Sequence, residues 1–298
     1  MQKTTKLNLE DVYKGYGGKV VLDNIDLRVS SGEFCTVVGP SGCGKSTLLR
    51  LILGQEAPDR GIVKVDGETV GTPTTQRGIV YQRYSLFPNR TVLDNVLLGK
   101  LFTDGQWWNP FYKNKAHIDE AMTYLERVRL THAAHKFPHE LSGGMQQRAA
   151  IAQALIMKPP ILLMDEPFGA LDPDTRDDLQ IFLLELWERE NLTIFFVTHD
   201  LVEACFLGSR LLVLSQYYTD DRGEGEAVNR GGRIIADHHL PPMATSTAVK
   251  ESVDFQALIH QVREEGFDPS IRQHVNEFNL KHPDSFQTLL AEENSTTV

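Results

Sequence analysis

The stretch Gly39-Pro-Ser-Gly-Cys-Gly-Lys45-Ser-Thr47 is the strongest indication of the fold in this chain of 298 residues. It fits the pattern G-x-x-x-x-G-K-[ST], which forms a phosphate-binding loop when it follows a strand and opens a helix. Both flanks meet that condition, because residues 34–38 are an apolar, strand-like run and residues 45–53 have a helical pattern closed by Gly54. Backbone N–H groups and the positive end of the helix can then surround phosphate oxygens. The sequence therefore predicts a strand–loop–helix unit that binds a nucleotide.

Every residue of this loop is a candidate nucleotide contact. The nine positions are Gly39, Pro40, Ser41, Gly42, Cys43, Gly44, Lys45, Ser46 and Thr47. In this motif the lysine reaches the β- and γ-phosphates and the hydroxyl after it holds Mg²⁺. We therefore expect Lys45 to bind phosphate and Ser46 to be a metal ligand. A glycine-rich turn without a ligand is the alternative, and the strand and helix on either side disfavour it.

A second stretch, Leu141-Ser-Gly-Gly-Met145-Gln-Gln-Arg148, narrows the class of nucleotide-binding protein. Ser142 can cap a helix that runs through Met157, while Gly143 and Gly144 offer N–H groups at its positive end. An ordinary helix cap is the alternative, and we expect Ser142 to do both. The stretch resembles the signature loop of ABC-type ATPases, and the resemblance covers residues 6 to 240. It implies a head-to-tail homodimer, in which the phosphate loop of one copy and the signature loop of the other close on one ATP.

An apolar strand that ends in two carboxylates, Ile161-Leu-Leu-Met-Asp165-Glu166, resembles the second nucleotide motif of the same family. Neighbouring residues on a strand face opposite sides, so the two carboxylates must differ in role. The resemblance implies that Asp165 binds Mg²⁺ through water and that Glu166 is the general base. Asp172 matches the loop that touches the partner copy. A solvated acidic pair at a strand end is the alternative.

Three further positions match the family residue by residue. His199 follows the apolar run 193–197 and matches the histidine that contacts the γ-phosphate. Gln82 follows the strand-like run 78–81 and matches the glutamine that senses Mg²⁺ and the attacking water. Tyr16 lies 23 residues before Gly39 and matches the aromatic residue that stacks on adenine, with Tyr13 as the alternative.

The order of these motifs predicts an α/β fold, a P-loop ABC-type ATPase domain at residues 1–245. The resemblance implies a mostly parallel core sheet, an antiparallel β subdomain and a helical subdomain at about 83–157. Residues 246–298 form a short, acidic, helical C-terminal extension that holds −5 of the net charge of −10. We expect three helices in it, around residues 255–262, 271–278 and 286–290, docked on the ATPase domain or on the partner copy. A packing role and a regulatory role for this extension are the alternatives.

Composition excludes several classes of protein. The net charge argues against nonspecific nucleic-acid binding. No apolar run approaches the roughly 18 residues of a transmembrane helix, and no signal peptide is visible. Cys35, Cys43 and Cys205 lack paired spacing, which is typical of reduced thiols in a cytosolic protein. Together with these features, the resemblance to ABC-type ATPases implies an enzyme that is peripheral to the cytoplasmic face of the inner membrane.

Met145 and the run Phe137-Pro-His-Glu140 resemble the nitrate, sulfonate and taurine importer group. This resemblance implies an ATPase subunit that uses ATP and Mg²⁺ to energise uptake of a small solute. Its expected partners are a second copy, transmembrane permease subunits and, indirectly, a solute-binding protein. The alternatives are a soluble ABC ATPase without a transport role and the motor subunit of an exporter.

Overall fold

The structure, a computed structural model, describes residues 4–75, 77–81, 86–104, 114–222, 229–240, 247–274 and 279–280. The chain forms two compact units, one of residues 1–73 with 197–298 and the other of residues 74–196. Among the described residues, no helix combines the length and the apolar character that crossing a bilayer requires.

The first unit begins with an antiparallel sheet whose strand order is β2-β1-β4-β5. Its strands are β1 (Thr5–Tyr16), β2 (Lys19–Ser30), β4 (Arg60–Val65) and β5 (Glu68–Thr69). A two-residue turn at 17–18 joins β1 to β2, as the Tyr16-Gly-Gly18 signal predicts. Alternate apolar residues of β1, such as Leu7 and Leu9, are fully buried. The expected antiparallel subdomain is confirmed.

A second group of strands in this unit carries the phosphate loop. The strands are β3 (Phe34–Val38), β9 (Arg210–Ser215), β11 (Arg233–His239) and β13 (Asn279–Leu280), in the order β13-β11-β9-β3. β3 runs parallel to β9, and β11 pairs back on β9 in the antiparallel sense. Every residue of β3 is buried, which explains its continuous apolar run.

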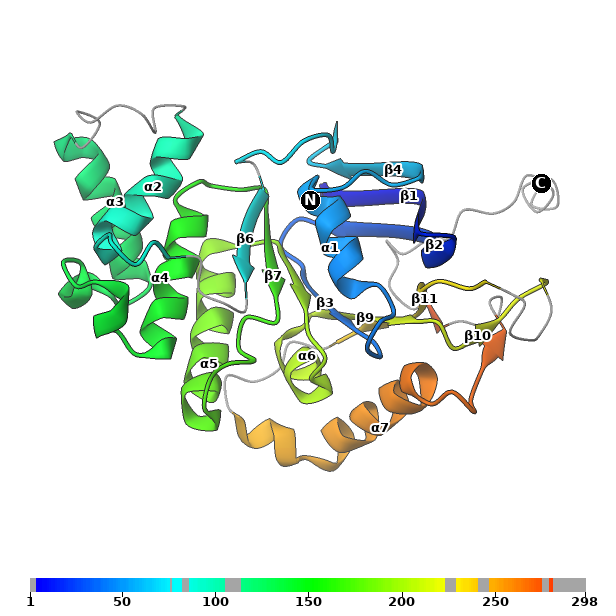
Figure 1. The fold of residues 1–298 in the computed structure, drawn as a ribbon. Helices are drawn as coiled ribbons and strands as arrows, with labels where there is room; N and C mark the ends of the chain where they lie inside the picture. The colour runs from blue at the N-terminus through cyan, green and yellow to red at the C-terminus, as the bar shows by residue number, and fades with distance from the viewer. Residues whose placement is uncertain are drawn as a thin grey trace. The chain divides into compact units, whose positions relative to one another are not determined.

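Helix α1 (Lys45–Leu53), drawn in blue in Figure 1, follows β3 after the phosphate loop at residues 39–44. Its N-cap residue, Gly44, has φ 105°, a left-handed conformation that a residue with a Cβ atom rarely adopts. The helix ends at Gly54, whose N–H caps the last turn. The strand, the loop and the helix of the motif are therefore all where the sequence predicts them.

In the described part of the second unit, strands in the order β8-β7-β6 occur together with four long helices. Its strands are β6 (Arg77–Tyr81), β7 (Ile161–Asp165) and β8 (Ile194–Val197, of which Val197 is counted with the first unit). Its helices are α2 (Val92–Thr103), α3 (Lys115–Arg127), α4 (Gly143–Leu155) and α5 (Pro173–Glu190). Each helix begins at a side chain that caps it: Thr91, Asn114, Ser142 and Asp172, in that order. Short 3-10 turns at Thr131–Ala133 and Pro138–Glu140 link α3 to α4.

The C-terminal part of the first unit packs on its strands. After α6 (Leu201–Leu207) and the 3-10 turn η4 (Thr247–Glu251), helix α7 (Val253–Phe267) buries Phe255, Ile259 and Val262. The Ser215 hydroxyl donates to the carbonyl of Gly266 at 2.7 Å, so α7 lies on β9 (Figure 1). The first predicted helix of the extension and its docking are confirmed.

The prediction of a second helix in the extension, around residues 271–278, is wrong for the residues that the structure describes there. Residues Gln273–His274 form β12, which pairs in parallel with β10 (Tyr218–Thr219), and residues 279–280 form β13. Strand partners on β10 and β11 offer backbone hydrogen bonds here, and such tertiary pairing overrides a short apolar periodicity. The third predicted helix lies outside the described residues. The division of the chain at residue 245 stays a prediction.

Candidate functional site

One side of the phosphate loop is buried in the protein and the other side is exposed to solvent. Ser41, Gly42 and Ser46 are exposed, whereas Gly39, Cys43 and Thr47 are buried. The amide of Cys43 donates to the carbonyl of Pro40 at 3.3 Å and closes a tight turn. The exposed face of the loop therefore consists of backbone and small side chains at the N-terminus of α1, which is a favourable place for an anion.

Lys45 lies inside this loop. Its side-chain nitrogen donates to the carbonyl of Gly39 at 2.7 Å and to that of Pro40 at 3.1 Å. The same nitrogen lies 3.9 Å from the sulfur of Cys43. The ammonium is thus desolvated and aimed at the centre of the loop, where a phosphate can take the place of the two carbonyls.

His199 is exposed at the end of β8, beside the phosphate-loop strand. The amide of Thr198 donates to the carbonyl of Val37 at 3.2 Å, which joins this strand end to β3. Asp200 caps α6 by accepting from the amides of Val202 and Glu203 at 2.9 and 3.2 Å. His199 therefore has a fixed backbone on both sides and an exposed ring.

Tyr16 and Tyr13 differ in exposure. Tyr16 lies at the end of β1, is 43% exposed, and its hydroxyl bonds to Glu56. Glu56 in turn pairs with Arg50 of α1 at 3.1 Å. Tyr13 is partly buried beneath the guanidinium of Arg60, 5.1 Å from the ring centre. Of the two, Tyr16 is the more exposed residue, and its role in stacking stays a prediction.

In the second unit, the predicted signature loop begins α4 as expected. The Ser142 hydroxyl accepts from the amide of Met145 at 3.3 Å, so the capping role is confirmed. Gln146 donates to the carbonyls of Pro138 and Leu141 and holds the preceding turn. Ser142 is exposed and Gly143 is half-buried, so their N–H groups lie at an accessible helix terminus.

The predicted partner-contact residue lies close to this helix terminus. Asp172 caps α5 by accepting from the amide of Thr175 at 3.0 Å, and this hydrogen bond lowers the pKa of its carboxyl. A Cβ atom on Gly144 would lie 2.6 Å from the methyl group of Thr175. The structure thus brings Ser142, Gly143, Gly144 and Asp172 together within the second unit.

The acidic pair stands at the end of β7. Asp165 is the last residue of the strand and pairs with Tyr81 of β6. Glu166 follows with φ 46°, a left-handed conformation that is uncommon for a side chain of its size. Strain of this kind is concentrated at functional sites. Asp165 is held in the strand and Glu166 in a left-handed conformation just beyond it, and their two separate roles stay predictions. Gln82 lies outside the described residues.

A polar network in the loop after β9 was missed by the sequence reasoning. That loop reads as solvated because it is rich in charged residues and glycine. The structure instead buries Tyr218 and joins it to Asp23 of β2. The presence of an aromatic residue, Tyr218, among aspartates and arginines could have indicated that part of this loop is buried.

The comparisons with known proteins place these motifs in one family. The sequence profile described as ABC transporter matches residues 22–169. The nitrate import ATP-binding protein NrtD of Synechocystis sp. is 47% identical over 210 residues, which are 70% of this chain and 76% of that protein. The chain belongs to the ABC transporter family. It is an ATP-binding cassette and an ATPase.

Other members of the family are nearly as similar. The aliphatic sulfonates import ATP-binding protein SsuB of Bacillus anthracis is 42% identical over 203 residues, 68% of this chain and 77% of its own. The spermidine/putrescine import protein PotA of Nitrosomonas europaea is 42% identical over 236 residues, 78% of this chain. The match spans 63% of PotA's own length.

Solved ABC cassettes share the fold. The structure of cbiO1 from Clostridium perfringens, part of the transporter complex cbiONQ, has a TM-score of 0.68 at 25% identity and covers 88% of this chain and 95% of that one. The cassette MJ0796, solved as a dimer in a post-hydrolysis state with ADP and Pi, has a TM-score of 0.62 at 31% identity, with 79% and 99% covered. The predicted fold class is confirmed.

Proposed function

We propose that this chain is the ATPase subunit of an importer and that it works as a homodimer with two composite ATP sites. In each site, Lys45 and the phosphate loop of one copy bind the phosphates, and Ser142 with its glycines closes on them from the other copy. The single observation that carries this proposal is that each loop stands directly before the N-terminus of an α-helix, α1 or α4, where the positive end of the helix favours an anion.

The remaining predicted residues have complementary chemistry. Glu166 takes the proton of the attacking water as general base, and His199 contacts the γ-phosphate. Tyr16 stacks on adenine, and Asp172 touches the partner copy. Gln82 links the bound phosphate to the permease. These roles follow from residue type and position, and each can be tested by one substitution.

Ser46, Asp165 and Gln82 would hold Mg²⁺. Mg²⁺ prefers oxygen ligands, keeps several waters and often takes only one or two protein side chains beside the substrate phosphates. The described residues include no cluster of three His, Cys, Asp or Glu side chains that could hold an ion alone. The exposed hydroxyl of Ser46 and the carboxylate of Asp165 fit that sparse ligand set. When bound, the ion neutralises charge on the phosphates.

We further propose that the dimer binds transmembrane permease subunits on the cytoplasmic face of the membrane. The similarity to NrtD and SsuB favours a small anion such as nitrate or a sulfonate as the solute, supplied by a binding protein. Co-purification of a tagged chain with the products of adjacent permease genes tests the partners. Growth of a deletion strain on nitrate, taurine or spermidine as limiting nutrient tests the solute.

The variant Glu166→Gln tests the base. ATP hydrolysis should slow by roughly 100-fold or more, because a general base is lost while binding is retained. The variant should also accumulate as a dimer with ATP, which light scattering measures. Glu188→Gln, an exposed glutamate of α5, is the matched control and should hydrolyse ATP like wild type. Near-normal phosphate release by Glu166→Gln would disprove the assignment.

The variants Lys45→Ala and Ser142→Arg test the composite site. Lys45→Ala should lose nucleotide binding within its own copy. Ser142→Arg should bind ATP as a monomer but fail to dimerise, because a long cation then occupies the closing face. Thr123→Arg, at an exposed position of α3, controls for the added charge. Dimerisation of Ser142→Arg at the wild-type ATP concentration would rule out the role in the partner copy.

A further inference from the structure

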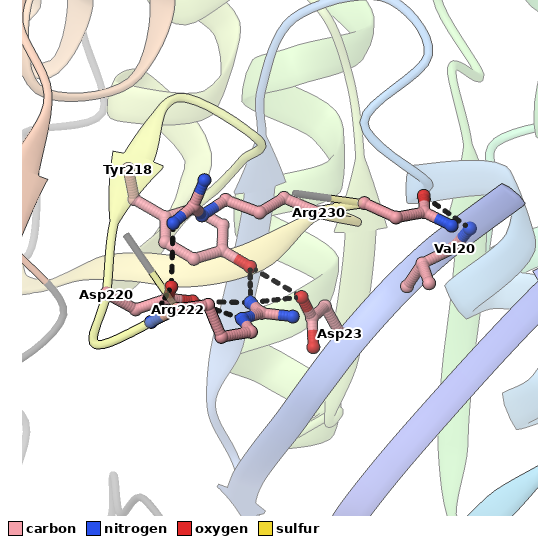
Figure 2. A network of polar contacts seen from close by, with 7 residues as sticks. Val20, Asp23, Tyr218, Asp220, Arg222 and Arg230 are labelled. Atoms are coloured by element: carbon pink, nitrogen blue, oxygen red, sulfur yellow. Dashed lines mark hydrogen bonds and ion pairs between the residues drawn. The ribbon is translucent and has the colours of Figure 1, made fainter. Parts of the chain in front are cut away.

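Two pieces of the loop after β9, residues 218–222 and 229–232, grip strand β2 (Figure 2). We call these pieces the clamp. The Tyr218 hydroxyl donates to a carboxylate oxygen of Asp23 at 2.8 Å, and Arg222 donates to the same oxygen at 2.6 Å. Asp23 is only 3% exposed. A carboxylate buried to this degree is stable only with such donors, and the clamp supplies them to Asp23.

The clamp is also braced internally. Asp220 accepts hydrogen bonds from both Arg222 and Arg230, the latter at 2.7 Å. The guanidinium of Arg230 lies 5.7 Å from the centre of the Tyr218 ring. Two arginines and two carboxylates around one buried tyrosine form a connected network rather than isolated surface pairs. Such a network fixes the positions of its members more strongly than single exposed pairs do.

Asn229 binds the β1–β2 hairpin itself. Its side-chain amide donates to the carbonyl of Gly18 at 2.7 Å, and its side-chain oxygen accepts from the amide of Val20 at 3.1 Å. The side-chain amide of Asn229 therefore makes one donor and one acceptor hydrogen bond to the hairpin backbone, as a residue of a neighbouring strand does. The main chain continues the pairing, because Gly232 donates to Val21 at 2.8 Å and accepts from Asp23 at 3.0 Å.

The part of β2 held in this way is the part that touches the phosphate loop. A Cβ atom on Gly44 would lie 2.6 Å from a methyl group of Leu22. On the other side, a Cβ atom on Gly232 would lie 1.8 Å from the carbonyl oxygen of Cys43. Residues 20–23 thus lie against both the phosphate loop and the clamp. Tyr16 is two residues before Gly18, at the same end of the hairpin.

We propose that the clamp positions the β1–β2 hairpin for adenine, with Asn229 as the positioning residue that holds Tyr16 in place. Asn229 does not touch the nucleotide. It fixes the turn that directly follows Tyr16, so that stacking does not first require the hairpin to be ordered. The inference rests on the proposed function, because it takes Tyr16 as the residue that stacks on adenine.

The test compares ATP with inorganic tripolyphosphate, which has the phosphates but no base. Titration calorimetry on the full chain measures both affinities. Asn229→Ala should weaken ATP binding by about fivefold, as expected when two exposed hydrogen bonds that order the hairpin are lost. Tripolyphosphate binding should change by less than about twofold. Tyr16→Ala should weaken ATP binding as well, and adding Asn229→Ala to it should weaken it no further.

Asn114→Ala is the matched control. It removes a side-chain cap on the amide of His117 in the other unit, so it should lower the melting temperature without changing ATP affinity. If Asn229→Ala folds poorly, Asn229→Asp keeps the acceptor for Val20, loses the donor for Gly18, and should give an intermediate ATP affinity.

Several outcomes would overturn the proposal. These are unchanged ATP affinity in Asn229→Ala, equal losses for ATP and tripolyphosphate, and full additivity with Tyr16→Ala. Unchanged ATP affinity in Tyr16→Ala would also overturn it, while leaving the phosphate loop as the ATP site. Failure of the wild-type chain to bind ATP would instead refute the proposed function.

Discussion

Replacing Arg210 with methionine should destabilise the protein by about 3–5 kcal/mol, which is the cost of removing one partner from a buried ion pair. The guanidinium of Arg210 is completely buried. It donates to both oxygens of Asp237 at 3.0 and 2.8 Å and to Glu33 at 3.2 Å. Burial alone would lower the pKa of Arg210, but the two carboxylates outweigh it and raise that pKa. The variant leaves both carboxylates buried without their shared cation.

The size of the effect can be read from thermal unfolding. The unfolding entropy of a chain of 298 residues is about 0.6 kcal/mol per kelvin, so the melting temperature should fall by roughly 5–8 °C. Calorimetry measures this shift. Arg129→Met is the control, because Arg129 and Glu185 form an exposed pair worth at most about 1 kcal/mol. Arg210→Met with the melting temperature of wild type would refute the reasoning.

Three further predictions concern stability and reactivity. Val262→Ala on the buried face of α7 should lower the free energy of unfolding by about 2 kcal/mol and the melting temperature by about 3 °C. If the ATPase rate per folded molecule of this variant is unchanged, the extension has a packing role, and if that rate changes, a regulatory role is favoured. The three buried cysteines should not react with a thiol reagent at pH 8 until the chain is unfolded, because burial raises the pKa of Cys43 and raises that of Cys205 to about 12; labelling of the native chain would contradict this. Burial opposes ionisation of Asp220, but hydrogen bonds from Arg222 and Arg230 outweigh it and lower its pKa to about 2, so its stabilisation is present above about pH 4 and lost towards pH 2. Asp220→Asn should therefore flatten the pH dependence of urea unfolding in that window, and an unchanged pH profile would contradict the assignment.

Elements with strong local signals could be predicted from the sequence. The run 34–38 is apolar throughout because β3 is buried on both sides, and α1 has a glycine at each end. The start of α4 could be predicted from Ser142 because capping is a local interaction. The candidate site consists mainly of such local motifs, which is why its loops could be located without a structure.

Features that depend on distant partners could not be predicted. Residues 273–274 have no strand signal of their own and become β12 only because β10 offers them a backbone edge. Likewise, Asn229 reads as a loop residue until the turn at Gly18 lies next to it. Nothing in the periodicity of either segment identifies its partner.

The contact between Tyr218 and Asp23 has a consequence for synthesis of the chain. The two residues are 195 positions apart, so at 5–20 residues per second about 10–40 s pass between their translation. Throughout that interval the carboxylate of Asp23 in the nascent N-terminal hairpin is without the hydroxyl of Tyr218, which donates to it in the folded chain. Strand β2, which is translated early, thus gains the donors for its buried carboxylate only after the segment around Tyr218 has been translated. Shortening the delay, or supplying a chaperone during it, should matter more for yield than the final stability of the hairpin.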